Sequence, residues 1–361
     1  MIGTRLKLAR AGAGLSLRAL AERAGHCVSA QAIGKYERDE MMPSSTALLA
    51  LAGALEVSPD FLVSQREITL SGLEFRRAPS ASSKEEKMVV ARVLEHMERY
   101  ATVEKALALR RDGLPLAALG RQRIKRPDDA FVIADVVRRH WHLGTDPIPS
   151  MTELLEERGI NVIALPLPSA VSGSKVHARM ANGEIVAGII INSSHTGERQ
   201  RFTLAHELGH LVVDVSGSLT ARAAEKAMDR FAGAFLVPDE ELRRVAGQHR
   251  STLSLGEMIE LKAHFKVSLQ CLALRLGQTK ILSDAAVTRL WQHLKSQGFF
   301  DPPAFPEPLP VEPEASHRLH RLAMRAVSEG AMSEPKAAEI LQVPVRLLGR
   351  WLEEGAHPAV Q

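Results

Sequence analysis

The sequence predicts an α+β protein that is mostly helical, and three observations support this. Residues 4–63 carry a series of short helical patterns separated by turn signals. Residues 128–276 combine helical patterns with two β-branched runs, at 160–165 and 185–191, which predict a small sheet. Residues 317–352 are typical of a final helical pair. The chain has 361 residues, and at about 150 residues per domain this length predicts two or three domains.

The composition narrows the class of protein. The chain is 45% hydrophobic and 24% charged, as in ordinary globular proteins. No apolar run approaches the roughly 18 residues of a membrane span, and the N-terminal MIGTRLKLAR lacks the apolar core of a secretory signal. Cys27 and Cys271 are the only cysteines, which excludes a disulfide framework and a four-cysteine zinc site. We therefore expect a cytoplasmic protein with no membrane partner.

The five helices expected within 4–63 follow from their end signals. Ser16 and Ser29 stand where N-caps belong, each directly before an apolar pattern, and a fourth helix is expected from Ser44. Gly25 follows the second pattern, as a helix terminator does, and Pro59 opens the fifth. These signals predict short helices joined by tight turns.

Beyond residue 63 the expected helices are longer. A linker rich in Ser, Ala and Pro is expected at 76–83, a basic loop at 113–128, and a stiff connector with six prolines at 301–313. Helical periodicity predicts helices over 84–111, 130–142, 150–158, 199–213, 221–236 and 254–276.

Positive charge is concentrated in the first third of the chain. The net charge is +4, but residues 1–38 hold seven Lys/Arg against two Asp/Glu, and residues 76–126 hold thirteen against six. Residues 127–280 hold seventeen against eighteen. The basic segments could attract a phosphate backbone. For 76–126 the two interpretations, a second DNA-contacting arm and a solvated helical face, stay open.

The strongest motif is His206-Glu207-Leu-Gly-His210, an H-E-x-x-H sequence. Residues i and i+4 share one helix face, so the two imidazoles can bind one Zn²⁺. Glu207 follows the first histidine and can act as a base on metal-bound water. The alternative is a histidine pair without a metal, but the motif lies in an apolar helix and a third ligand candidate follows it.

That third candidate is Glu225, which with Asp229 forms another i, i+4 pair. A catalytic zinc takes three protein ligands and keeps one open position. Glu225 would complete a set of two histidines and one glutamate, and Asp229 could accept the outer N–H of a ligand imidazole. An isolated acidic pair is usually a solvated face, but its position one helix after the motif favours the site.

The runs ERQRFTLAHELGHLVV and EKAMDRFAGAFLVP together resemble the ImmA/IrrE family of zinc metallopeptidases. The resemblance covers about 128–280. It implies a mostly helical, gluzincin-like peptidase domain with a small β-sheet, His206, His210 and Glu225 as metal ligands, Glu207 as the catalytic base, and Asp229 in support. The chain departs from the family at Ala227–Met228, where Glu-Ala is frequent.

The expected cofactor is Zn²⁺, with Mn²⁺ or Fe²⁺ as alternatives for the same donor set. A peptidase also needs a donor for the oxyanion. Tyr36 and Tyr100 are the only tyrosines and lie outside this region, so the weak candidates are His177, His195 and Arg222. The strand at 185–191 is expected to offer an edge to an extended substrate.

Residues 16–40, SLRALAERAGHCVSAQAIGKYERDE, resemble the helix-turn-helix of the XRE family of Cro-like and phage-repressor-like regulators. The resemblance implies that the third helix enters the major groove. Ser29 and Gln31 would then lie at the base edges, and the amide of Gln31 could form two hydrogen bonds with adenine. Lys35 and Arg38 would hold phosphates. Cys27 is interpreted as a packing residue of the turn, with redox sensing as a minor alternative.

Residues 328–344 resemble a second helix-turn-helix, but a small helical cap or dimer contact is the favoured interpretation. The domain organisation expected is a helix-turn-helix (HTH) domain at 1–66, a basic helical linker at 67–126, a peptidase domain at 127–282 and a helical C-terminal tail at 283–361.

The sequence therefore predicts a DNA-binding transcriptional regulator that carries a zinc endopeptidase. The expected partners are a double-stranded DNA operator, a repressor-like or antitoxin-like protein substrate, and a second copy of the chain, because such domains often pair on symmetric half-sites. The alternative is a non-proteolytic repressor or antitoxin that uses the peptidase fold as a sensor or partner-binding module.

Overall fold

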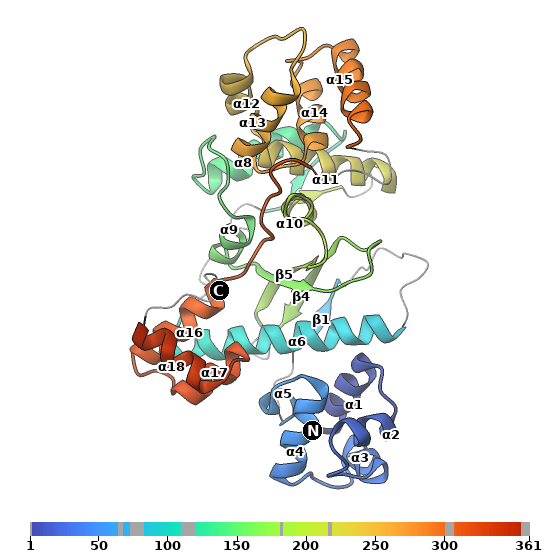
Figure 1. Cartoon of the computed structure of the whole chain (residues 1–361), viewed down its shortest axis with the longest axis vertical. Helices are drawn as coiled ribbons and strands as arrows, with labels where there is room; N and C mark the ends of the chain where they lie inside the picture. Colours follow the sequence, from blue (N-terminus) through green and yellow to red (C-terminus); the bar gives the residue numbers. More distant parts are fainter. Residues whose placement is uncertain are drawn as a thin grey trace. The chain divides into compact units, whose positions relative to one another are not determined.

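The structure is a computed structural model that describes residues 2–63, 68–72, 83–109, 120–180, 183–215, 219–299 and 307–354. Helices dominate and the strands form small sheets (Figure 1), as expected of the predicted α+β class. The chain divides into two compact units. The first comprises Met1–Arg111, Val176–Gly188 and Ser316–Gln361, and the second comprises Asp112–Lys175 and Ile189–Ala315. No helix among the described residues is long and apolar enough to cross a membrane.

The first unit begins with the five predicted short helices. Ser16 and Ser29 accept backbone N–H groups at the starts of the second and third helices, so both predicted caps are confirmed. Ser44 caps the fourth helix in the same way. Their buried core includes Leu6, Ile33 and other apolar side chains. The helices are α1 (Ile2–Ala13), α2 (Leu17–Arg23), α3 (Ala30–Glu37), α4 (Ser45–Leu55) and α5 (Pro59–Val63).

The same unit contains the long helix α6 (Ser83–Ala106) and the C-terminal helices α16 (Arg318–Ser328), α17 (Glu334–Leu341) and α18 (Val345–Glu354). Tyr100 and Val103 of α6 are buried in one cluster with Ala323, Leu348 and Trp351 of the C-terminal helices (Figure 1). The sequence predicted a helical pair here, but the structure has three helices. The second helix of the predicted pair is divided into α17 and α18, because Gln342 directly after α17 adopts a left-handed conformation.

The main sheet has the order β1-β4-β5-β3, formed by Thr69–Ser71, Gly173–Arg179, Ile185–Asn192 and Asn161–Leu165. The two predicted strands are β3 and β5. Strand β4 was not predicted because Val176 is the one β-branched residue in its run, whose other residues have low strand propensity. It pairs antiparallel with β1. A second sheet pairs β2 (Gln122–Arg123) with β6 (Val213–Asp214) in parallel.

One sequence expectation about the sheet is wrong. The run at 185–191 was expected to offer a free edge to a substrate, but β5 lies between β4 and β3. Its side chains are buried at almost every position after Ile185. A continuous apolar run marks an interior strand, because only a strand covered on both faces excludes polar residues from both.

The helices of the second unit are close to those expected, with three differences. The predicted helix 254–276 is two helices, because Lys266 adopts a left-handed conformation and Ser268 caps a new start. Helices α12 and α15 were not predicted. The unit holds α8 (Asp129–His140), α9 (Met151–Glu157), α10 (Gly197–Val212), α11 (Ala221–Leu236), α12 (Asp239–Ala246), α13 (Leu255–Phe265), α14 (Leu269–Gln278) and α15 (Asp284–Ser296).

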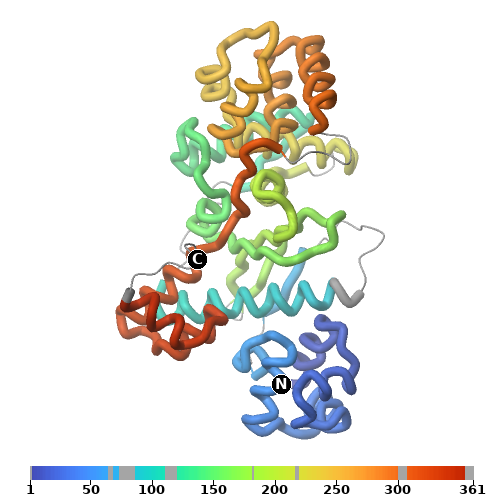
Figure 2. The backbone as a smooth tube through the Cα atoms, viewed as in Figure 1, coloured from blue at the N-terminus to red at the C-terminus, as the bar shows by residue number. Residues whose placement is uncertain are grey.

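The predicted linker at 76–83 lies outside the described residues except for Ser83, where α6 begins. Of the proline-rich connector, residues 307–313 are described and form neither helix nor strand. The segment that contains them, 307–315, runs beside α10 and α9 (Figure 2). We call residues 307–315 the strap.

Candidate functional site

Helices α10 and α11 pack closely enough to bring their polar side chains to one place. Gly209 makes this approach possible, since a Cβ there would lie 3.1 Å from the sulfur of Met228 and 3.1 Å from the ring of Phe231. Helix α11 is strongly amphipathic, with Met228 and Phe231 buried and Glu225 on the more accessible side. The two predicted motifs are therefore held on adjacent helices.

The structure brings His206, His210 and Glu225 together. One ligand atom from each lies within 4.8 Å of the other two. His206 Nε2 is 3.4 Å from Glu225 Oε2, and His210 Nε2 is 3.7 Å from Glu225 Oε1. Ligands about 2.0–2.1 Å from a tetrahedral zinc are separated by about 3.3–3.4 Å. The donor set and its spacing fit a zinc ion with little adjustment.

Asp229 lies one helical turn beyond Glu225 and faces the other side of the His206 ring. His206 Nδ1 is 2.9 Å from Asp229 Oδ1. A carboxylate in this position keeps the proton on Nδ1, so that Nε2, which faces Glu225, carries the lone pair. The pairing gives Asp229 the position that the sequence predicted for a supporting acid.

Glu207 is 8% exposed and belongs to the buried side of α10, one residue after His206. A buried carboxylate has a restricted position and limited access to bulk water, which suits a proton acceptor.

The three candidate oxyanion donors differ in their surroundings. His195 is engaged in the loop after β5, where its Nε2 is 3.1 Å from the carbonyl oxygen of Ser169, and burial lowers its pKa. His177 belongs to β4 in the first unit, opposite Ser71. Arg222 is exposed in the first turn of α11, three residues before Glu225. Of the three, Arg222 alone shares a helix with a predicted ligand.

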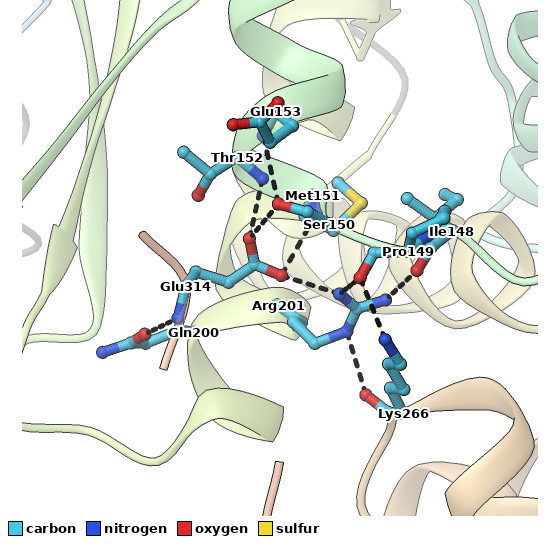
Figure 3. Close-up of polar contacts among 10 residues, drawn as sticks. All are labelled: Ile148, Pro149, Ser150, Met151, Thr152, Glu153, Gln200, Arg201, Lys266 and Glu314. Carbon is cyan, nitrogen blue, oxygen red and sulfur yellow. Dashed lines mark hydrogen bonds and ion pairs between the residues drawn. The ribbon is translucent and has the colours of Figure 1, made fainter. Parts of the chain in front are cut away.

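A buried ion pair that the sequence did not predict lies five residues before His206. Arg201 Nη1 donates to Glu314 Oε1 at 2.7 Å, and the two side chains are 1% and 4% exposed. Arg201 also donates to the carbonyl oxygens of Ile148, Pro149 and Lys266 (Figure 3). Burial alone would raise the pKa of Glu314, but the charge of Arg201 and backbone donors outweigh it and lower that pKa.

No local pattern could have identified this pair. An arginine within an apolar helix signals that some acceptor must be present, because a buried guanidinium needs partners. The acceptor is 113 residues away in sequence, directly after a connector whose prolines predict only stiffness.

A pocket of about 530 Å³ lies in the second unit next to Asp229. Its walls come from α10, α11, α14 and the strap, and they are more apolar than polar. The lining residues are Thr196, Glu198, Arg199, Phe202, Asp229, Gly233, Ser268, Gln270, Cys271, Leu274, Arg275, Gln278, Glu307 and Pro310.

On the HTH domain, α3 presents the predicted DNA-contacting residues. Gln31, Lys35 and Arg38 are exposed, while Ile33 and Tyr36 are buried in the core. Ser29 Oγ is occupied as the helix cap, accepting from the backbone N of Ala32. Arg38 donates to both carboxylate oxygens of Glu40, at 2.6 and 2.8 Å.

The interpretation of Cys27 as a packing residue is wrong. Its side chain is exposed, and the thiol donates to the carbonyl oxygen of Ala24 at 2.9 Å. The turn is packed instead by Ala24 and Val28, which are buried. Cys271 is buried, and burial raises the pKa of its thiol to about 12, which makes it unreactive.

The basic segment after residue 76 is partly used within the fold. Arg92 of α6 pairs with Glu56 and Glu95, and Arg99 donates to the carbonyl oxygen of Ile340. Burial lowers the pKa of Arg99. Arg92 and Arg99 thus have structural roles within the fold, and for the rest of 76–126 the two interpretations stay as the sequence left them.

The fold and the site together define a class of protein: an HTH domain joined to a domain whose two adjacent helices bring two histidines and a glutamate together. Comparison with protein families gives the particular families. Residues 6–62 match a helix-turn-helix family. Residues 155–277 match a peptidase family described as the IrrE N-terminal-like domain. These two matches agree with the predicted fusion of an XRE-type HTH domain to an IrrE-like peptidase domain. A comparison with curated proteins found no match.

Proposed function

We propose that this chain is a DNA-binding transcriptional regulator carrying a metal-dependent endopeptidase, which cleaves a repressor-like or antitoxin-like protein. The observation that carries the proposal is the convergence of His206, His210 and Glu225 within 4.8 Å, inside the segment that matches the peptidase family. The HTH domain supports the DNA-binding part of the proposal.

His206, His210 and Glu225 would hold the metal. Zinc suits two imidazoles and one carboxylate best, and Mn²⁺ or Fe²⁺ are alternatives. When bound, it would polarise the scissile carbonyl and lower the pKa of a water molecule toward neutrality. Asp229, 2.9 Å from His206 Nδ1, would fix the tautomer in which Nε2 carries the lone pair.

Glu207 would carry the proton transfer. Its carboxylate would accept the proton of the attacking water and then deliver it to the leaving amine. Its low exposure supports this role, because a carboxylate shielded from bulk water keeps the proton for the second step. The oxyanion partner stays open, and Arg222 is the candidate that shares α11 with Glu225.

The DNA-binding role would fall to α3. Gln31 and Lys35 are one turn apart and both exposed, so they can face a groove together. Arg38 can exchange Glu40 for a phosphate at small cost, because exposed ion pairs contribute about 0–1 kcal/mol. Two copies of the chain would bind the two halves of a symmetric operator.

The test replaces Glu207 by glutamine in the full chain. Glu207→Gln keeps the size of the side chain and the three metal ligands, but it cannot accept the proton. We expect cleavage of neighbouring-gene repressor or antitoxin products to fall by about 10²–10⁴-fold, with bound zinc and DNA affinity unchanged. Cleavage is followed by gel electrophoresis and mass spectrometry, and zinc by elemental analysis.

The matched control is Glu240→Gln on α12, where the side chain is exposed, and it should cleave as the parent protein does. Cleavage by Glu207→Gln at the parental rate would contradict the mechanism. The non-proteolytic regulator would be favoured by two results together: the parent protein cleaves none of the candidate proteins, and Glu207→Gln leaves DNA binding and its response to the inducing signal unchanged.

A further inference from the structure

The strap lies outside the segment that matches the peptidase family, yet it is fastened to that unit along its length. Leu269 N donates to Glu307, Val311 N donates to Glu198, and Glu314 N donates to Gln200 at 2.8 Å. A segment without helix or strand hydrogen bonds must satisfy its backbone elsewhere. Here the backbone N–H groups of Val311 and Glu314 do so on side chains of α10, and the side chain of Glu307 accepts from α14.

The strap approaches the start of α10 very closely. A Cβ added to Gly197 would lie 2.3 Å from the carbonyl oxygens of both Val311 and Glu312. Because those atoms belong to the backbone, they cannot move aside without displacing the strap. A side chain at position 197 would therefore clash with the strap, which explains why α10 begins with a glycine.

Glu314 is the most heavily bonded side chain of the strap. Its carboxylate accepts from Ser150 Oγ and from the backbone N of Met151 and Thr152, at 2.8–3.1 Å, and also from Arg201. It thus joins the start of α9 to α10 (Figure 3). Arg201 in turn holds the loop before α9 and the turn after α13 through three carbonyl oxygens.

The other end of the strap reaches the surroundings of Asp229. Glu307 and Pro310 line the same pocket as Asp229, whose carboxylate holds the His206 ring. Two contacts of the strap therefore lead toward the metal ligands: one through Arg201 along α10, and one through the pocket wall.

We propose that the strap is part of the metal centre's scaffold, and that Glu314 is a positioning residue that fixes the histidine-bearing helix through Arg201. This rests on the proposed function, since it concerns the same site. Arg201 precedes His206 by five residues on one rigid helix, so a rotation of α10 at Arg201 displaces both histidines relative to Glu225 on α11. The matched peptidase segment is then incomplete without residues 307–315.

The experiment measures Co²⁺ binding to the full chain by its visible absorption, which reports the geometry and the affinity of the site without any substrate. The principal variant is Glu314→Gln, which removes the charge and keeps the size. Glu312→Gln is the control, because that side chain is exposed on the same strap. Titrations are made well below the unfolding temperature of each metal-free protein, so that the folded fraction is equal.

We expect Glu314→Gln to weaken Co²⁺ binding about tenfold, at the lower end of the loss found when groups that orient metal ligands are removed, and to change the absorption bands. Glu312→Gln should differ from the parent by less than twofold. A merely structural role would lower the unfolding temperature and leave the affinity and bands of the folded protein unchanged, and that result would overturn the proposal.

Gly197→Ala provides a second variant that leaves the ion pair intact but displaces the strap. It should reproduce the weakened Co²⁺ binding, whereas Gly256→Ala, which meets no atom closer than 4.0 Å, should not. If Glu314→Gln does not fold, the proposal is overturned when Gly197→Ala binds Co²⁺ as tightly as the parent protein does. If the parent itself binds no Co²⁺, or if His206→Ala binds it equally well, the proposed function fails instead, so the two failures are distinguishable.

Discussion

Single side chains in this protein acquire their roles from the neighbours that the fold places beside them. Asp229 is 58% exposed and would be an ordinary surface acid without His206 at 2.9 Å. Arg38 is as exposed as a phosphate-binding residue should be, but it is paired with Glu40 in the absence of DNA. Residue type therefore limits the candidate roles, and the contacts within the fold select among them.

The two α3 side chains should differ in how they affect DNA binding. Gln31→Ala should reduce the discrimination between bases at one position of the operator by about 1–3 kcal/mol. Lys35→Ala should instead weaken binding to all DNA sequences, and it should reduce the slope of log affinity against log salt concentration by about 0.9. The measurement is a mobility shift at several salt concentrations, with a duplex selected from a random library.

Thr46→Ala, an exposed change on α4, serves as the control for both variants. Equal losses on selected and unrelated duplexes for Gln31→Ala would show that Gln31 does not read a base. An unchanged salt slope for Lys35→Ala would exclude a phosphate contact.

At the scale of elements, helix ends account for much of the agreement between sequence and structure. Ser16 and Ser29 cap helices where the sequence placed them, because capping needs only a residue and its next three neighbours. The break between α13 and α14 was missed, since Lys266 in a left-handed conformation carries no local signature of the kind that glycine gives. Strand β4 was missed because its residues, apart from Val176, have low strand propensity, and its pairing with β1 is a tertiary contact.

The start of α13 should make stability depend on pH. Glu257 accepts from Ser254 N and from Arg250, and these contacts lower the pKa of Glu257 to about 2. The unfolded chain has an ordinary carboxyl pKa of about 4.3, so the stabilisation is complete above that pH and disappears as the pH falls toward 2. Because the side chain is 41% exposed, we expect it to contribute about 1 kcal/mol.

Thermal unfolding of Glu257→Gln at a series of pH values measures this contribution. The variant should melt lower than the parent at pH 7, and the two should converge between pH 4.3 and 2. Glu260→Gln, an exposed change on the same helix, should behave as the parent throughout. A difference that stays constant down to pH 2 would contradict the assignment.

At the scale of the whole molecule, the chain alternates between its two units. The first unit draws on the N-terminal 111 residues, a piece of the sheet and the C-terminal helices, and the second lies between them in sequence. Within the first unit, α6 carries two packing surfaces. Its start meets α1, where a Cβ on Gly12 would lie 2.7 Å from the Cα of Met88, and its end shares a core with α16–α18.

Gly12→Ala should therefore separate α1 from α6. The added methyl meets backbone rather than a movable side chain, so we expect a loss of about 1–3 kcal/mol. Denaturant unfolding of the full chain, followed by far-ultraviolet circular dichroism, measures it. Gly53→Ala is the control, because nothing lies within 4 Å of its Cβ position, and it should stabilise α4 by about 0.5–1 kcal/mol. Equal stability of the Gly12→Ala variant and the parent would show that the two helices do not pack as described.

The sequence by itself determined the features that depend on neighbouring residues. These are the helix caps, the histidine pair of α10, the acidic pair of α11 and the apolar run of β5, each of which lies within one element. The tertiary structure alone decided which elements meet: that β5 has no free edge, that the C-terminal helices pack on α6, and that Glu314 reaches Arg201 across 113 residues. Such contacts depend on chain topology and on the free-energy cost of burying charge, and neither produces a periodic pattern in the sequence.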